Sequence, residues 1–178
     1  MIRSVKNTQK IYLEGKRETY FFKQILKITG NEKKFPIRNL SGSSHENMIR
    51  NVISDMFIGA KILIIDNSNR TKGKIPLLEN NEELLKRMKE NSIYCIISKN
   101  QFDDEIIDFI DIPKISNKNS KESIEQYLKN NGLVWVDFLK NKIKDKKYLK
   151  DNISKIKCKT LKNLLSKILD SHNDDIYE

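Results

Sequence analysis

The sequence has few cysteines, no secretion signal and no long hydrophobic run. Its two cysteines, Cys95 and Cys158, lie far apart and show no metal-ligand spacing, so we expect two buried thiols in a reducing compartment. Residues 1–10 are polar and no apolar segment follows them, which argues against a signal peptide. No apolar run approaches the roughly 20 residues that a membrane-spanning helix needs. We therefore expect a cytoplasmic protein.

Histidine and phosphate-loop lysine are also scarce where chemistry would need them. His45 and His172 have no serine or cysteine placed to form a catalytic constellation with them, so hydrolase triads and zinc sites are not expected. Residues 41–44, Ser-Gly-Ser-Ser, could cradle a phosphate at a helix N-terminus but lack the lysine of a Walker motif. The simpler prediction is that Ser43 or Ser44 caps the helix that follows.

Positive charge is what the sequence has in excess. The chain of 178 residues carries a net charge of +10. The stretch 132–169 contributes +8 of this excess, since it holds eleven lysines against Asp137, Asp145 and Asp151. A concentrated basic surface indicates a polyanionic partner, with nucleic acid ahead of an anionic membrane or an acidic protein. The alternative is a compositional bias that places lysine wherever the surface is free.

Apolar patterns predict strands and helices in alternation over the first 110 residues. Short apolar runs without polar alternation, of which Ile62 to Ile65 is the clearest, are typical of strands covered on both faces in a parallel sheet. Runs with helical spacing lie between them. This order predicts an α/β fold with a mostly parallel four-stranded sheet flanked by helices. The expected strands are 10–14, 35–40, 61–66 and 92–98, and the expected helices are 16–29, 44–56, 79–90 and 101–110.

The strands stop after residue 110, and a lysine-rich helical extension is expected from there. Residues 111–120 resemble a linker, 121–131 and 133–144 are predicted helices, and Cys158 to Ile168 has a clear amphipathic pattern. We expect an α/β domain at 1–112 and a basic helical extension at 113–178 that packs on it. Trp135 would serve that packing, and base stacking is the alternative.

Three acidic positions follow predicted strands. Glu14, Asp66 and Asp103 each come just after a strand, so in a parallel sheet they would meet at the edge where the strands end. Converging carboxylates repel one another unless a cation lies between them, and oxygen ligands of this kind suit Mg²⁺. Such an ion could activate water and stabilise a leaving oxygen in phosphoryl chemistry. The acids at 103–105 would also suit the first turn of a helix on their own account.

These motifs resemble a known family. The run Ile11-Tyr12-Leu13-Glu14-Gly15, the aromatic-rich helix after it and Ile64-Ile65-Asp66 resemble the Toprim domain of topoisomerases, primases and OLD-type nucleases. The resemblance is closer to small bacterial anti-phage Toprim proteins, the RloB-like and related abortive-infection effectors, where Ser98-Lys99-Asn100-Gln101-Phe102-Asp103 looks like a third shared segment. It spans residues 10–110, and the basic tail has no part in it.

The resemblance implies roles for particular residues. Glu14 would be the general acid/base or a metal ligand, and Asp66 the first acid of an Asp-x-Asp motif that holds Mg²⁺ or Mn²⁺. Ser68 stands where the second acid belongs, so Asp103 or Asp104 would have to replace it. The resemblance also implies a partner ATPase of the ABC or OLD type, and tRNA or DNA as target.

Two hypotheses follow from the sequence. The first is a metal-dependent nuclease of bacterial anti-phage defence, whose phosphate-binding residues are Lys16, Arg17, Arg70, Lys72, Lys74, Lys142, Lys144, Lys146 and Lys147. The second is a catalytically degenerate Toprim module that binds nucleic acid or an ATPase as a regulatory subunit.

Overall fold

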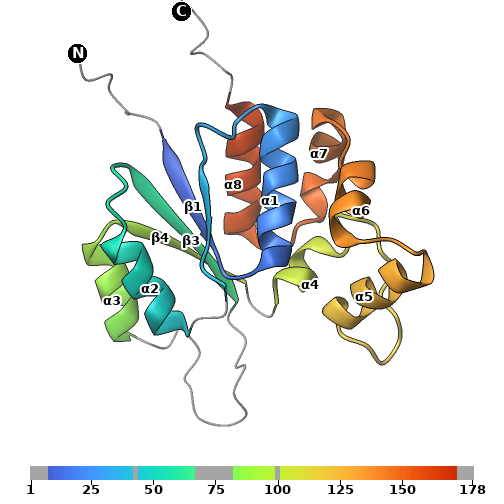
Figure 1. The fold of residues 1–178 in the computed structure, drawn as a ribbon, viewed down its shortest axis with the longest axis horizontal. Coiled ribbons are helices and arrows are strands. Elements are labelled where there is room, and N and C mark those ends of the chain that lie inside the picture. The colour runs from blue at the N-terminus through green and yellow to red at the C-terminus, as the bar shows by residue number, and fades with distance from the viewer. Residues whose placement is uncertain (1–7, 42–43, 67–81, 99–100, 172–178) are drawn as a thin grey trace, which may run out of the picture. The chain divides into compact units, whose positions relative to one another are not determined.

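A four-stranded, all-parallel sheet flanked by helices forms the centre of the fold (Figure 1). The computed structural model describes residues 8–41, 44–66, 82–98 and 101–171. The strands lie in the order β2-β1-β3-β4, and each neighbouring pair runs parallel. The α/β class expected from the sequence is confirmed. The elements are β1 (Gln9–Leu13), α1 (Lys16–Thr29), β2 (Ile37–Asn39), α2 (His45–Ser54), β3 (Ala60–Asp66), α3 (Glu82–Glu90), β4 (Ile93–Ser98), α4 (Phe102–Ile106), α5 (Ser120–Asn130), α6 (Trp135–Lys142), α7 (Lys146–Asn152), a 3-10 turn (Ile153–Lys155) and α8 (Lys159–Asp170).

The chain falls into two compact units. The sheet unit comprises the described residues of 1–19 and 33–100, and the helical unit those of 20–32 and 101–178. Most of α1 thus belongs with the C-terminal helices, although its first turn belongs with the sheet. The expected division at residue 112 concerns pieces that would fold alone, which compactness does not test, so it stays a prediction.

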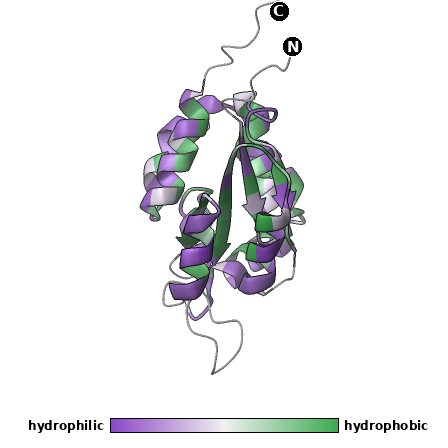
Figure 2. Cartoon of the chain, turned by 90° about the vertical axis from the view of Figure 1, so that its left-hand side faces the viewer, coloured by the Kyte–Doolittle hydropathy of each residue, from purple (hydrophilic) through white to green (hydrophobic). Residues whose placement is uncertain are grey.

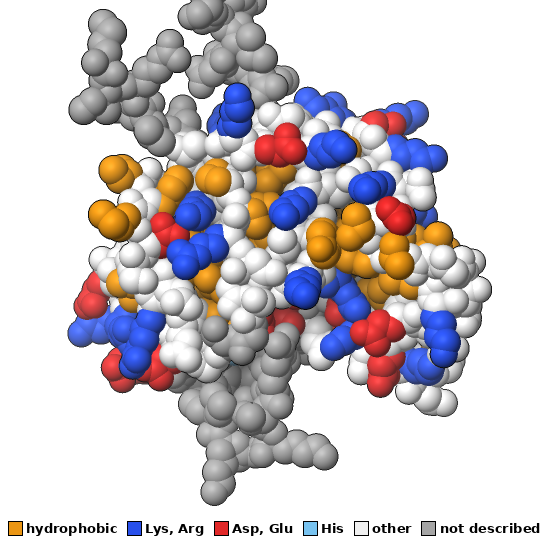
Figure 3. All heavy atoms as spheres, in the orientation of Figure 1, with side chains coloured by type: hydrophobic (Ala, Val, Ile, Leu, Met, Phe, Trp, Pro, Cys, Tyr) orange, Lys and Arg blue, Asp and Glu red, His pale blue; other side chains and the backbone are white. Residues whose placement is uncertain are grey.

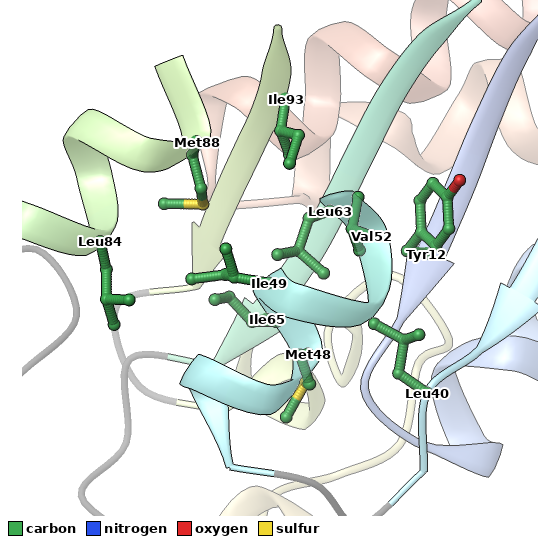
Figure 4. Close-up of a cluster of buried hydrophobic side chains, with 10 residues drawn as sticks. All are labelled: Tyr12, Leu40, Met48, Ile49, Val52, Leu63, Ile65, Leu84, Met88 and Ile93. Carbon is green, nitrogen blue, oxygen red and sulfur yellow. The ribbon is translucent and has the colours of Figure 1, made fainter. Parts of the chain in front are cut away.

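Apolar side chains from strands and helices build the core of the sheet unit (Figure 4). One face of the sheet meets α2 and α3, whose inward residues recur at helical spacing. Figure 2 shows the same division, since the strands are mostly hydrophobic and the helices carry both colours. Residues of the opposite face, such as Ile11 and Ile64, are equally buried, which explains why the strands show no polar alternation. The cluster in Figure 4 consists of Tyr12, Leu40, Met48, Ile49, Val52, Leu63, Ile65, Leu84, Met88 and Ile93.

Aromatic rings form the core of the helical unit. Phe21 of α1 makes edge-on contacts with Phe102 and Phe109, both with ring centroids at 5.5 Å. Phe109 in turn meets the ring of Tyr148, whose hydroxyl donates to the Phe109 carbonyl at 2.7 Å. Near the C-terminal end of α8, Asn31 donates to the Ile168 carbonyl at 2.7 Å. These contacts join the aromatic part of α1 to the C-terminal helices.

The structure corrects several boundaries. β2 covers only 37–39, because Pro36 before it has no N–H to donate to a neighbouring strand. Helix α7 was not expected, since only Tyr148 and Leu149 interrupt its polar residues; its signal was Asp145, which caps it by accepting from the Tyr148 N–H at 2.8 Å. Cys158 was expected on a buried helical face, but it is the N-cap of α8 and is partly exposed. No helix in the described ranges is long and apolar enough to cross a membrane.

Candidate functional site

Glu14 and Asp66 lie at the same edge of the sheet. β1 and β3 are parallel neighbours, and Leu13 at the end of β1 is in register with Ile64. Glu14 therefore follows its strand next to the last residues of β3, where Asp66 ends that strand. This is the edge formed by the carboxyl ends of the strands, where ligands collect in open α/β sheets.

The two acids are close enough to touch. A Glu14 carboxylate oxygen, Oε2, accepts a hydrogen bond from the backbone N–H of Asp66 at 3.1 Å. Both side chains are nearly inaccessible, with exposed fractions of 3% for Glu14 and 6% for Asp66. The backbone of one strand thus fixes the orientation of the acid that follows the neighbouring strand. The sequence predicted this meeting across 52 residues of chain.

The turn after Glu14 leads directly into α1. The Gly15 carbonyl accepts from the Thr19 N–H at 3.2 Å and from the Thr19 hydroxyl at 2.7 Å, which closes the first helical turn. Lys16, one of the predicted phosphate-binding residues, is exposed at the start of this helix, and Arg17 beside it is partly exposed. Two cationic residues therefore follow Glu14 at once. They are placed to attract an anionic substrate to this edge.

Asp103 and Asp104 belong to α4 in the helical unit. Asp104 accepts from the Ser120 hydroxyl and, at 3.3 Å, from the backbone N–H of Gln101, so it holds the start of α4. Asp103 is buried, with 8% of its surface exposed. Because it lies in the other compact unit, its meeting with Glu14 and Asp66 stays a prediction. Asp104 has a structural role that the sequence reading assigned only as the alternative.

Several predicted site residues lie outside the described part of the chain. They are Ser68, Arg70, Lys72 and Lys74, together with Ser43 and His172. Ser44 lies inside it and is the N-cap of α2, since its hydroxyl accepts from the Asn47 N–H at 3.3 Å. The capping prediction for this segment is confirmed at that residue.

The donor set at the sheet edge suits a hard divalent cation. Among the described residues, no group of three or more histidine, cysteine, aspartate or glutamate side chains is placed to hold a metal ion. Mg²⁺, however, is usually held by one or two carboxylates and fills its remaining positions with water and substrate phosphate. Glu14 and Asp66 fit that requirement by residue type and by proximity. They are the residues that would hold Mg²⁺ or Mn²⁺.

The lysines of the C-terminal region differ in what they contact. Lys142 forms an ion pair with Asp111 at 3.1 Å, and its ammonium lies 5.9 Å from the centre of the Tyr148 ring. Lys155 and Lys142 together hold the pKa of the Asp111 carboxyl below its usual range. Lys144, Lys146 and Lys147 are exposed at the start of α7, and none of them pairs with a described acid. Three of the four predicted phosphate-binding lysines in this region are therefore available to a ligand.

A second charged cluster lies at the amino ends of the strands, where the sequence gave no warning. Asp55, just after α2, accepts from Lys10 at 2.8 Å and from Arg38 at 2.7 Å. Burial opposes ionisation of Asp55, but these two hydrogen bonds outweigh it and hold the pKa of the carboxyl well below its usual range. Burial, with the Asp55 carboxylate next to it, raises the pKa of Tyr12 far above its ordinary value. Tyr12 therefore stays protonated at any physiological pH.

The thiols offer little reactivity to a catalytic mechanism. Both cysteines are free, and burial raises the pKa of Cys95 to about 12. The thiolate, which is the nucleophilic form, is therefore scarce at Cys95 near neutral pH. Comparison with known proteins adds no further assignment, because no family model, no curated protein and no solved structure matches this chain.

Proposed function

We propose that this protein is a metal-dependent nuclease that cleaves phosphodiester bonds in RNA, with tRNA as one candidate, or in DNA. One observation carries the proposal: the buried carboxylates of Glu14 and Asp66 come together at the carboxyl edge of a parallel sheet, joined through a 3.1 Å hydrogen bond. Acids in that position are suited to binding a divalent ion and a phosphate group.

The roles divide between the two acids. Mg²⁺ or Mn²⁺, when bound, would supply an activated water and stabilise the leaving oxygen. Asp66 would be a ligand to the ion. Glu14 would be a second ligand or the general base that takes a proton from the attacking water, and its orientation is set by the Asp66 N–H.

Cations supply the grip on the substrate. Lys16 and Arg17 follow Glu14 directly, and Lys144, Lys146 and Lys147 extend a positive surface in the helical unit. Phosphate contacts from such residues give affinity without sequence preference. A role as the effector of a bacterial anti-phage system under a partner ATPase is the part of the proposal that rests on the resemblance to Toprim defence proteins alone.

The alternative is a degenerate module that binds nucleic acid or an ATPase and cuts nothing. Ser68 favours it, because the Toprim pattern has an acid at that position and a serine hydroxyl is a weaker, neutral ligand. The two functions differ in one measurable respect. The nuclease cleaves in the presence of a divalent ion, whereas the module only binds.

Cleavage assays with isosteric variants test the proposal. The purified full-length chain is incubated with Mg²⁺ or Mn²⁺ and with tRNA, single-stranded DNA and duplex DNA. We expect cleavage that EDTA abolishes and that falls about a hundredfold or more in Glu14→Gln and in Asp66→Asn, because each loses a charge needed for the ion or the proton transfer. Glu46→Gln is the matched control, since Glu46 is an exposed acid of α2 paired only with Arg50, and it should cut like the wild type.

Binding measured on the same samples separates the two functions. Fluorescence anisotropy with each nucleic acid shows whether an uncut substrate is bound. If the wild type binds but leaves every substrate intact with either metal and with a candidate ATPase present, the nuclease is excluded and the binding module stands. Equal cleavage by Glu14→Gln and the wild type would show that another site performs the reaction.

A further inference from the structure

The loop between α2 and β3 presents two apolar side chains to solvent. We call residues 55–59, Asp-Met-Phe-Ile-Gly, the Met56 loop. Met56 is 93% exposed and Ile58 is 82% exposed, more than any other large hydrophobic residue in the described part of the chain. Figure 3 shows hydrophobic side chains gathered over this loop, with lysine and arginine side chains next to them.

The Met56 loop is anchored at its start by a buried charge. The Asp55 side chain is 9% exposed and binds Lys10 of β1 and Arg38 of β2. Its other oxygen, Oδ1, accepts from the Phe57 N–H at 2.9 Å and so turns the chain. The Phe57 ring lies inward, with the Lys10 ammonium 5.6 Å from its centre. Met56 and Ile58, on either side of Phe57, consequently point outward.

Two further features hold the loop. The Lys61 ammonium of β3 donates to the Val52 carbonyl at 2.9 Å and to the Asp55 carbonyl at 2.7 Å, which ties the end of α2 to the start of β3. Gly59 has a φ of 150°, and a Cβ there would lie 2.6 Å from the Thr8 carbonyl oxygen and 2.8 Å from the Phe57 ring. Only glycine fits such a close approach. The two exposed side chains are therefore presented by an ordered support.

We propose that the Met56 loop is a docking element for a protein partner whose surface offers an apolar pocket with an acidic rim. Exposed apolar side chains mark interaction sites, and a loop ordered before binding loses little conformational entropy when it binds. Lys10, Arg38 and Lys61 surround the loop and outnumber Asp55, so a negative rim complements it. This proposal goes beyond the nuclease function and does not depend on it.

Other occupants fit the loop less well. A second copy of the chain would bring the same lysines and arginine against each other, in a protein with a net charge of +10. An anionic lipid surface needs cations that can reach the headgroups. Here Lys10 and Arg38 are bound to Asp55, and Lys61 is bound to two backbone carbonyls. A protein pocket asks for shape and rigidity, which the loop has.

Site-specific crosslinking identifies the occupant. A benzophenone side chain replaces Ile58 in the full-length chain expressed in its own host cells, and light attaches whatever protein covers the loop. That protein is then purified, and its Kd is measured by calorimetry with the wild type and with the double variant Met56→Ser, Ile58→Ser. Tyr94→Ser is the matched control, since Tyr94 is 70% exposed on β4 of the same unit.

The expected result is one crosslinked protein whose Kd for the double variant rises about tenfold or more, because truncating a central apolar anchor costs at least about 1.4 kcal/mol. The Kd for Tyr94→Ser should stay within about twofold of the wild type, a change of less than about 0.5 kcal/mol. Crosslinks only to a second copy, with a mass that rises with concentration, would overturn the proposal. So would binding of the wild type, but not of the double variant, to phosphatidylglycerol vesicles, or equal affinity of the purified protein for wild type and double variant.

Discussion

At the residue scale, buried carboxylates do different work at the two ends of the strands. Asp55 at the amino ends is neutralised by two cations and holds a loop, whereas Glu14 at the carboxyl ends accepts a backbone N–H and faces Asp66. Ionisation of Asp55 is favoured by its partners, which lower its pKa despite burial. Its contribution is therefore to stability, and it depends on pH in a definite direction.

Substituting Asp55 by asparagine tests that contribution. We expect Asp55→Asn to lower the free energy of unfolding at pH 7 by about 2–3 kcal/mol, because charge-assisted hydrogen bonds are lost. A carboxyl whose pKa is lower in the folded state stabilises the fold above the unfolded value of about 3.9. That contribution is lost as the pH falls through the folded value, so the gap between wild type and variant should close in acid.

Urea unfolding between pH 7 and pH 3 measures this gap. Asp108→Asn is the control, because Asp108 pairs with Lys157 at 2.9 Å on an exposed surface and should cost no more than about 1 kcal/mol. A gap for Asp55→Asn that stays constant down to the lowest pH would contradict the assignment.

At the scale of elements, α1 contributes to both compact units. Its first turn follows Glu14 in the sheet unit, and its aromatic residues pack in the helical unit. The sequence predicted a strongly apolar helix here, and the strand-turn-helix order placed Glu14 correctly. It did not predict that the helix would pack its rings against residues about eighty positions later in the chain, because periodicity shows which face is buried and not what covers it.

The ring cluster on α1 gives a prediction for stability. Phe21 is fully buried and contacts three other phenylalanine rings, so Phe21→Ala should lower the free energy of unfolding by about 3–5 kcal/mol. Tyr20→Ala on the same helix is the matched control, since Tyr20 is 39% exposed and should cost about 1 kcal/mol. Chemical denaturation followed by the fluorescence of Trp135 reports on both. A loss for Phe21→Ala no larger than for Tyr20→Ala would show that the rings contribute little.

At the scale of the whole molecule, net charge matters most. The chain carries +10, but only part of that charge is available to a polyanion, because some lysines are bound to acids within the helical unit. Lys142 is one of these, and Lys144, Lys146 and Lys147 are not. The sequence could not separate them, since all four are lysines within six residues.

The salt dependence of nucleic-acid binding tests this separation. Neutralising Lys144, Lys146 and Lys147 to glutamine should reduce the slope of log affinity against log salt by about two, because each phosphate contact contributes about 0.7–0.9. Lys142→Gln should change the slope little. The control is Lys33, Lys89 and Lys121 to glutamine, which removes the same charge from exposed positions elsewhere. An equal reduction in both triple variants would assign the lysines to net charge alone.

The sequence by itself determined the parallel α/β sheet, the N-cap at Ser44 and the meeting of Glu14 with Asp66. These follow from local patterns, because an apolar run, a turn and an amphipathic helix specify a strand-helix unit, and parallel strands bring their carboxyl ends to one edge. Tertiary structure alone decided that Asp55 meets Lys10 from 45 residues away and that Met56 and Ile58 project from the loop it anchors. Such pairings depend on where distant side chains meet, and no short-range pattern in the chain encodes that.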